Sequence, residues 1–390
     1  MQSILEIGTA ISSEKDYNRL LEMILNRIME LPHADAGTLY LADGDVLRFK
    51  IMRNNTMHTY EGGDGKEPNL PPVKLSRENV CAMSYLENRT VCIENVRTST
   101  EYDFSGPVRY DAMTGYHTQS MLVVPMHNRQ GERLGVIQLI NAMDAAGDVC
   151  AFPADIIPAV ESVASQAAIT IQNVLYIENI KELFESFVRV MSSAVDERTP
   201  YNASHTRHMV EYGRHFIDYL NGKAKEAGQP LLFNTAHKHE LLMSVWLHDI
   251  GKIGIPDAVL NKPSRLTDEE YEIMKSHVLI GGDILKDFTI VQDVADGARY
   301  HHERYDGKGY AKGLKGEEIP LNARIIGIAD AFDAMTSNRV YRQKMDMDYV
   351  LSELRKGSGT QFDPNIVKIM ISLIEEGIID PSKRYEGGEA

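Results

Sequence analysis

The sequence predicts two folded domains of different class joined by a long helix: an α+β domain first, then an all-α domain. Two hairpin signals in the first third predict a sheet, and helical periodicity in the later segments predicts helices. The chain has 390 residues, more than one average core uses, so its length also favours two or three domains. We expect the α+β domain over residues 1–158, the connecting helix over 159–195 and the all-α domain over 196–384.

The N-terminal domain is predicted to contain a helix and two hairpins. Residues 14–31 carry apolar side chains at helical spacing. Strand-like residues between 38 and 49 flank an Asp43-Gly44 turn, and a second hairpin is expected over 121–140, with a polar turn at 127–132. The stretch between the hairpins, residues 61–120, contains Gly and Tyr residues and is suited to cap a pocket.

The connecting helix carries apolar residues at spacings of three and four from Val160 to Val195, without a Gly or Pro. A stripe of that length predicts a parallel coiled coil, and hence a homodimer that relays a signal between the two domains. The alternative is a helix that is buried between the two domains of its own chain. Pro200 ends the run.

Composition and charge exclude several classes of protein. The net charge of -15 argues against a protein that binds DNA or an anionic membrane through charge. Three cysteines without a CxxC spacing argue against a disulfide framework. There is no secretory signal, and the longest uncharged helical run, residues 162–177, is too short and polar to span a membrane. We expect a cytoplasmic protein with no membrane span.

Seven His and Asp side chains are predicted to face the interior of the all-α domain. Nine of the thirteen histidines lie beyond residue 200, and several fall on the apolar faces of predicted helices. Burying that many polar groups without partners would cost about 1–3 kcal/mol each, whereas one metal ion satisfies several of them. The seven residues are His205, His248, Asp249, His277, His301, His302 and Asp330.

Imidazole and carboxylate ligands together select a transition metal, and seven ligands are more than one ion with an open position uses. We therefore expect two ions that share Asp249. The first would be completed by His205, His248 and Asp330, and the second by His277, His301 and His302. A water shared by two cations loses a proton near neutral pH and can attack a phosphodiester.

Two strand-like runs in the N-terminal domain resemble the GAF domain, a small-molecule sensor module. They are SMLVVPM at residues 120–126 and LGVIQLIN at 134–141. Asn141 is followed by Ala142 rather than by the Lys found in GAF domains that bind cyclic mononucleotides, so the resemblance does not imply cGMP or cAMP as ligand. A sensor of an unidentified small molecule and a ligand-free dimerisation domain remain alternatives.

Four motifs in the second half resemble those of the HD-GYP phosphodiesterases, in the family's order and spacing over residues 186–384. They are HDIGKIGIP at 248–256, HHERYDGKGY at 301–310, IADAFDAMTS at 328–337 and GTQFDP at 359–364. The family implies a helical HD-type fold, two iron or manganese ions, and hydrolysis of cyclic di-GMP to linear pGpG or on to GMP.

The resemblance carries the metal role onto the seven residues named above. It also implies a catalytic role for Asp249, one of the seven. Lys252, which is not a ligand, would be catalytic as well and would lie near the scissile phosphate. Arg339 and Arg342 would hold phosphates, and Tyr310 would contact a guanine. The implied partners are cyclic di-GMP, diguanylate cyclase domains, a small-molecule ligand of the GAF domain, and a second copy of the chain.

Three departures from the family pattern stand out. Ala311 follows Gly309-Tyr310 where the family has Pro, which predicts a looser loop without loss of a ligand. Tyr201 stands four residues before His205, where some members carry a Glu for a third metal, so two metals and release of pGpG are favoured. His208 replaces a usual Arg and is interpreted as a surface residue rather than as a partner of a metal ligand.

Three alternative functions remain. The first is a phosphodiesterase for another cyclic dinucleotide, such as cyclic GMP-AMP. The second is a catalytically weak signalling module that binds a dinucleotide. The third, an HD nucleotidase that acts on mononucleotides, is disfavoured by the His301-His302 pair and by Arg339 and Arg342.

Overall fold

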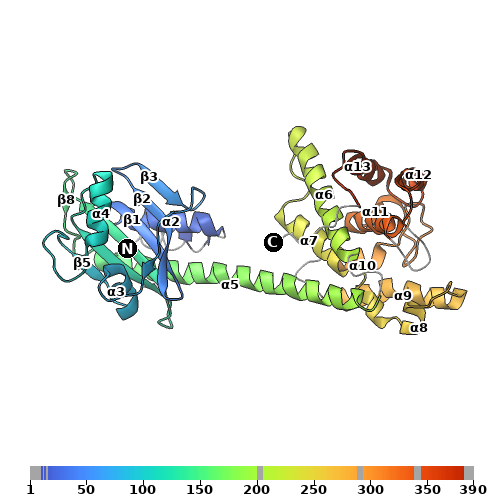
Figure 1. Cartoon of the computed structure of the whole chain (residues 1–390), viewed down its shortest axis with the longest axis horizontal. Coiled ribbons are helices and arrows are strands. Elements are labelled where there is room, and N and C mark those ends of the chain that lie inside the picture. The colour runs from blue at the N-terminus through green and yellow to red at the C-terminus, as the bar shows by residue number, and fades with distance from the viewer. Residues whose placement is uncertain are drawn as a thin grey trace. The chain divides into compact units, whose positions relative to one another are not determined.

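The computed structural model describes residues 10–11, 13–14, 16–199, 205–287, 293–337 and 344–381. The chain divides into two compact units, Met1–Lys181 and Glu182–Ala390 (Figure 1). Within the described ranges, no helix is long and apolar enough to cross a membrane.

The N-terminal unit is built on an antiparallel sheet in the order β3-β2-β1-β7-β6-β5. The strands on this path are β1 (Ala34–Asp43), β2 (Val46–Asn54), β3 (Thr59–Gly62), β5 (Val91–Ile93), β6 (Met121–His127) and β7 (Arg133–Met143). The short strands β4 (Val73–Lys74) and β8 (Val149–Cys150) pair with β2 and β7. The two predicted hairpins are β1–β2 and β6–β7. In the first turn, Gly44 has a φ of 59°, which glycine adopts without strain.

Each face of this sheet is covered by a different apolar cluster. Helix α2 (Tyr17–Glu30) and the first part of α5 (Ile157–Asp196) cover one face, where Leu20, Ile137 and Val160 are fully buried. Helix α3 (Val80–Glu87) and residues up to Phe104 cover the other face. Helix α4 (Ser105–Thr114) follows them. The predicted α+β class is confirmed, and residues 61–120 pack their own apolar side chains onto the sheet.

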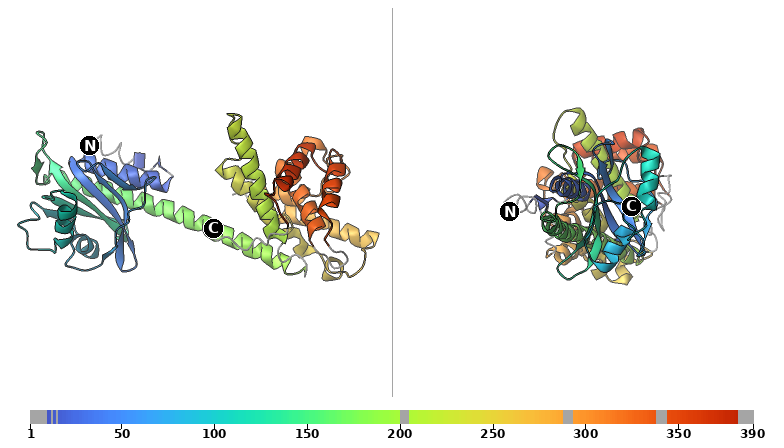
Figure 2. Two further views of the ribbon diagram at one scale, coloured as in Figure 1. Left: turned by 45° about the horizontal axis from the view of Figure 1, so that its top comes forward. Right: turned by 90° about the vertical axis from the view of Figure 1, so that its left-hand side faces the viewer.

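Helix α5 has 40 residues and spans the whole stretch that the sequence predicts as one helix. Figure 2 shows it as a single uninterrupted helix. Its early apolar residues are buried in the N-terminal unit, and Val188 and Val195 are buried in the C-terminal unit. A second apolar stripe on the same helix is exposed. It consists of Tyr176, Ile180, Leu183, Phe187 and Val190, whose exposed fractions run from 53% to 71%.

The C-terminal unit is helical, as predicted, and its described residues form no strand. Its α-helices are α6 (His205–Glu226), α7 (Thr235–Leu247), α8 (Asp257–Leu260), α9 (Asp268–Leu285), α10 (Val294–Tyr300), α11 (Leu321–Thr336), α12 (Met347–Gly357) and α13 (Pro364–Glu375). Two short 3-10 helices are η1 (Ile250–Gly254) and η2 (Gly316–Glu318). The predicted capping box at the start of α9 is present: Thr267 Oγ1 accepts from Glu270 N, and the Glu270 carboxylate accepts from Thr267 N.

Two apolar clusters fix the helices around the predicted site. The larger joins α6, α7, α11, α12 and α13 through residues such as Phe216 and Phe332, both fully buried. The smaller joins the end of α5 to α7, η1, α9 and α10. Within it, η1 lies against α9 so closely that Gly251 touches the backbone of His277 and Gly281. The absence of a side chain at residue 251 therefore sets how close these two elements can come.

We expect Gly251→Ala to destabilise the C-terminal unit by about 1–3 kcal/mol or more, because a Cβ there would collide with the main chain of α9. Gly222→Ala is the matched control: it also lies in this unit, on α6, where a Cβ meets nothing within 4 Å. That change should leave stability equal or raise it by about 0.5–1 kcal/mol. Thermal denaturation of both variants tests this, and equal melting temperatures would contradict it.

Candidate metal centre

The seven predicted ligand residues come from five segments of the C-terminal unit, and the fold brings them together in one place. Neighbouring imidazole rings lie close together, with centroids 5.5 Å apart for His205 and His248, 5.2 Å for His248 and His301, and 4.1 Å for His301 and His302. The contributing segments are the start of α6, the end of α7, the middle of α9, the end of α10 and the last half of α11. They carry His205, His248 with Asp249, His277, His301 with His302, and Asp330 respectively.

The imidazoles are held by hydrogen bonds on one ring nitrogen, which leaves the other free to bind. His248 Nδ1 donates to the carbonyl oxygen of Val245 at 2.7 Å, and His277 Nδ1 donates to that of Met274 at 2.6 Å. His301 Nδ1 lies 3.0 Å from the carbonyl oxygen of Ala298. These bonds place a proton on Nδ1, so Nε2 is the ring nitrogen that is left to bind a cation.

A carboxylate performs the same task for His205. Its Nδ1 lies 2.7 Å from Asp333 Oδ2, so its Nε2 turns toward Asp330 at 3.6 Å. The other Asp333 oxygen lies 3.0 Å from His208 Nδ1. The interpretation of His208 as a surface residue was therefore wrong: its side chain is 22% exposed and shares Asp333 with His205. Such an outer carboxylate fixes the tautomer and the direction of an imidazole.

The donor atoms form two groups with a carboxylate between them. Nitrogen atoms of His277, His301 and His302 lie within 4.8 Å of one another, and so do donor atoms of His205, His248 and Asp249. Asp249 faces both groups. Its Oδ2 lies 3.3 Å from His248 Nε2, and its Oδ1 lies 3.6 Å from His277 Nε2. This is the arrangement that a carboxylate shared by two cations requires.

Burial and charge keep most of these groups in the protonation state that binds a cation. Burial lowers the pKa of His277 and, with its histidine neighbours, holds that of His301 well below the usual value. Burial also lowers the pKa of His302 to about 4. Despite its burial, Asp249 has a pKa well below the usual value because of the charges of Lys252 and His248.

The pKa of His248 is shifted in the opposite direction. Burial lowers its pKa, but the charge of Asp249 outweighs burial and raises the pKa of His248 to about 9. A proton and a metal cation therefore compete for its Nε2, and metal binding at this atom is expected to release a proton.

Unpartnered imidazole nitrogens show, independently of the sequence motifs, that these residues fit a divalent metal. The Nε2 atoms of His248, His277 and His301 are buried and have no hydrogen-bond partner. Three unsatisfied imidazole nitrogens in one small region would be costly in an apolar core. A divalent cation that these nitrogens bind at about 2.0–2.1 Å would satisfy them together.

Lys252 lies beside this centre on η1. Its Nζ donates to Asp249 Oδ2, and its side chain is 20% exposed. Although burial lowers the pKa of Lys252, the negative charge of Asp249 raises it, so the ammonium stays protonated. A protonated amine at this position can donate to a phosphate oxygen or to a leaving alkoxide.

The ring of Tyr310 packs beside one of the candidate ligands. Its ring is 4.9 Å from that of His302, at an interplanar angle of 31°. Lys275 lies over the same ring, with Nζ 5.9 Å from its centroid. Lys275 was not among the predicted site residues. Only its position two residues before His277 could have indicated it.

The loop after Tyr310 is hydrogen-bonded to Glu303. Ala311 has a φ of 130°, which proline cannot adopt. The next two residues, Lys312 and Gly313, donate their main-chain N–H groups to Glu303 Oε1 at 2.6 and 2.9 Å. The backbone at Ala311 is thus one that proline cannot adopt, and the Glu303 carboxylate binds the two residues that follow; the looser loop stays a prediction.

Three residues of the prediction lie outside the described residues. They are Tyr201, Arg339 and Arg342. A cavity of about 210 Å³ adjoins the metal centre, with His302 and Asp330 at one side and Arg304, Arg324 and Gln361 among its other lining residues. It gives the centre polar surroundings that include two guanidinium groups.

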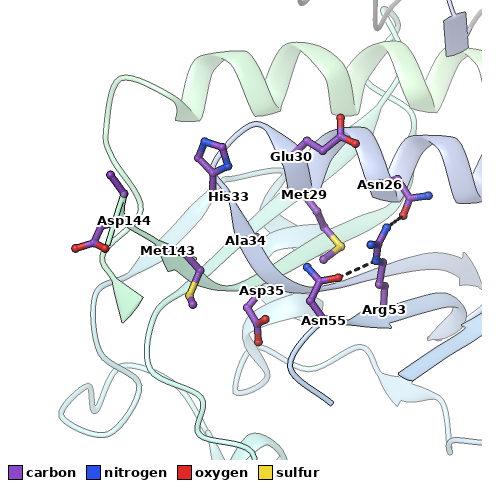
Figure 3. Close-up of a pocket in the computed structure, with 11 residues that line it drawn as sticks. Asn26, Met29, Glu30, His33, Ala34, Asp35, Arg53, Asn55, Met143 and Asp144 are labelled. Carbon is purple, nitrogen blue, oxygen red and sulfur yellow. Dashed lines mark hydrogen bonds between the residues drawn. The ribbon is translucent and has the colours of Figure 1, made fainter. Parts of the chain in front are cut away.

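The N-terminal unit has a larger cavity, of about 500 Å³, between the end of α2, β1, the end of β2 and the turn after β7. Figure 3 shows Arg53 at its edge, bonded to Asn26 and Asn55. The stretch 61–120, which was expected to cap a pocket, lies over the other cluster of the sheet. The cavity mixes one guanidinium with acidic side chains, including Glu30 and Asp35.

Two family models match the two halves of the chain. A family model described as HD domain matches residues 189–366, and one described as GAF domain matches residues 14–172. A GAF domain from an Acinetobacter phosphoenolpyruvate-protein phosphotransferase is a structural neighbour, with 15% identity and a TM-score of 0.34, over 46% of this chain and 96% of that one.

Two curated relatives are named phosphodiesterases. A "Cyclic di-GMP phosphodiesterase" of Thermotoga maritima is 43% identical over 171 residues, which cover 43% of this chain and 45% of the relative. A "3'3'-cGAMP-specific phosphodiesterase 2" of Vibrio cholerae is 31% identical over 212 residues, 54% of this chain and 38% of the relative. The chain thus spans less than half the length of either. The predicted domain classes are confirmed: the chain contains an N-terminal GAF domain and a C-terminal HD domain.

Proposed function

We propose that this chain is a metal-dependent phosphodiesterase that hydrolyses cyclic di-GMP to linear pGpG. The observation that carries the proposal is the pair of donor groups on either side of Asp249, with buried imidazole nitrogens that lack other partners. The named activities of the two curated relatives support the same reaction class.

The proposed cofactor is a pair of divalent ions, iron or alternatively manganese, held by the seven residues of the predicted set. When bound, such ions lower the pKa of a water molecule and neutralise phosphate charge. Imidazole-rich sites with carboxylates favour these metals over magnesium or calcium. Tyr201 is uncharged and supplies no carboxylate for a third ion, which supports two ions and release of pGpG.

The side chains around the ions have separate tasks in this proposal. Asp249 would be a ligand of both ions, and it accepts from Lys252, whose ammonium would stabilise charge on the scissile phosphate or protonate the leaving oxygen. Tyr310, whose ring lies beside that of His302, is proposed to offer a face or its hydroxyl to a guanine. Arg339 and Arg342 are proposed to hold phosphate oxygens, for which planar guanidinium groups are well suited.

Cyclic GMP-AMP is the second candidate substrate, because one relative is named as specific for it. Competition between the two dinucleotides in a single reaction separates the candidates. A lower kcat/KM for cyclic di-GMP than for cyclic GMP-AMP would overturn the first choice. Binding of cyclic di-GMP by metal-loaded protein without any linear product would instead indicate a non-catalytic module.

We also propose that the GAF domain regulates turnover, through an unidentified small molecule, in a cytoplasmic homodimer that can associate with diguanylate cyclase domains. Support for the dimer comes from the exposed stripe on α5. Its members, Tyr176, Ile180, Leu183, Phe187 and Val190, follow the alternating spacing of four and three that a two-stranded coiled coil uses. The free cysteines are compatible with a reducing compartment.

We predict that Lys252→Ala retains both metal ions but loses turnover by about 100-fold or more, because it removes a proton donor without removing a ligand. Asp249→Ala should lose metal and turnover together, since it removes the shared carboxylate. Metal analysis and product chromatography of the two variants test this. Full metal content and full rate in Asp249→Ala would show that the bridging role is wrong.

Asp333→Ala should weaken metal binding by about 10–100-fold, because His205 loses the carboxylate that directs its ring. Asp283→Ala is a matched control on the outer side of α9, where the carboxylate pairs with Arg299 and is 67% exposed. Titration of both variants with Mn²⁺ measures the effect. Equal affinities would mean that Asp333 does not orient a ligand.

Leu183→Glu should convert the dimer to a monomer, since it places a charge in the middle of the exposed stripe. Lys181→Glu changes charge two residues away, outside that stripe, and should leave the dimer intact. Sedimentation equilibrium gives the mass of each. A wild-type chain that sediments as a monomer would exclude the coiled-coil dimer.

A further inference from the structure

Arg198 lies two residues beyond the end of α5 and is hydrogen-bonded to the segment that carries Lys252. Its Nη1 donates to the carbonyl oxygen of Lys252 at 2.7 Å, and its Nη2 donates to that of Ile255 at 2.9 Å. Nη2 also lies 2.8 Å from Asp257 Oδ1. In return, Asn261 Nδ2 donates to the carbonyl oxygen of Arg198 at 2.9 Å. Both the side chain and the main chain of Arg198 are thus tied to one segment, residues 252–261.

The chemistry of these contacts calls for an arginine. The two carbonyl oxygens stand at the end of η1, where that of Lys252 also accepts from Ile255 N at 3.1 Å. A guanidinium presents several N–H groups in a fixed plane and can bridge two oxygens, whereas an ammonium is a single point charge on a flexible stem. The Arg198 side chain is 28% exposed, so its two bonds to carbonyl oxygens are partly shielded from water, whereas the contact with Asp257 is exposed.

The end of α5 is also packed against the elements on which the metal centre stands. Val188 and Val195 are buried in one cluster with Leu247, which directly precedes His248, and with Ile250 of η1. The side chains of Asp196 and of Thr206, the residue after His205, are both buried and interact. The last turns of α5 therefore pack against residues that are next to His205, His248 and Asp249 in the sequence.

We propose that Arg198 is a positioning residue that acts through Lys252. The Arg198 clamp on the carbonyl oxygens of Lys252 and Ile255 holds the Lys252 ammonium at Asp249, and it makes turnover depend on the position of α5. The part that concerns turnover rests on the proposed phosphodiesterase function. The part that concerns the segment 252–261 rests on the hydrogen bonds alone.

A double-mutant cycle with the full-length, metal-loaded chain tests the catalytic part. Arg198→Ala should lower kcat for cyclic di-GMP by about 10- to 100-fold, the loss that a misplacement of about 1 Å produces. Its metal content and KM should stay at wild-type values. In the Lys252→Ala background, Arg198→Ala should have no further effect on kcat. Loss of metal, or the same fold-loss in both backgrounds, would overturn a role through Lys252.

Two further variants separate the clamp from simple charge. Arg198→Lys keeps a cation near Asp257 but cannot bridge two carbonyl oxygens, so its kcat should fall nearly as far as that of Arg198→Ala. Full activity in Arg198→Lys would overturn the clamp. Arg189→Ala is the matched control: this arginine also lies on α5, pairs with Glu185 and is 44% exposed. It should retain wild-type kcat.

Hydrogen exchange distinguishes failure of this inference from failure of the proposed function. Arg198→Ala should speed amide exchange in residues 250–261 and leave α12 and α13 unchanged. If the wild-type chain turns over no cyclic dinucleotide, the proposed function fails, and the exchange result still decides whether the clamp exists. Unchanged exchange in residues 250–261 would overturn the inference whatever the activity.

Discussion

The carboxylate of Asp249 is the group on which the geometry of the C-terminal unit depends. Its two oxygens face two sets of imidazoles, and Lys252 contacts it from a third side. A buried carboxylate is stable only with partners of opposite charge or with good donors. Lys252 alone leaves the imidazole nitrogens of His248, His277 and His301 unsatisfied. Two cations would satisfy the carboxylate and the imidazoles together, which explains why so many polar groups share one interior.

Helix ends and outer hydrogen bonds supply the precision that this arrangement needs. His248 and His301 terminate α7 and α10, where main-chain carbonyls are free to accept from Nδ1. Asp333 directs His205 from one turn further along α11 than Asp330. The close approach of η1 to α9 at Gly251 brings Asp249 and His277 to within a few ångströms. The helices and their outer hydrogen bonds thus fix the orientation of the candidate ligands as well as their burial.

Periodicity and motif spacing were sufficient to predict the two domain classes, both N-terminal hairpins, the long helix and the convergence of His205, His248, Asp249, His277, His301, His302 and Asp330. Features that depend on three-dimensional contacts were not predictable. His208 was misinterpreted because only the folded chain shows that it shares Asp333. Nothing in the sequence around Ala311 reveals that Glu303 accepts from the two residues that follow it. The contacts of Arg198 could not be predicted, because its partners are main-chain carbonyl oxygens and the sequence pattern describes side chains only.

The metal content of anaerobically purified chain tests the central claim most directly, because ferrous iron would otherwise be oxidised and lost. The account predicts two divalent ions per chain, released when the protein is titrated to acid as His248 and its neighbours take up protons. One ion or none per chain, in protein whose seven candidate ligands are intact and folded, would contradict a centre built around a shared Asp249.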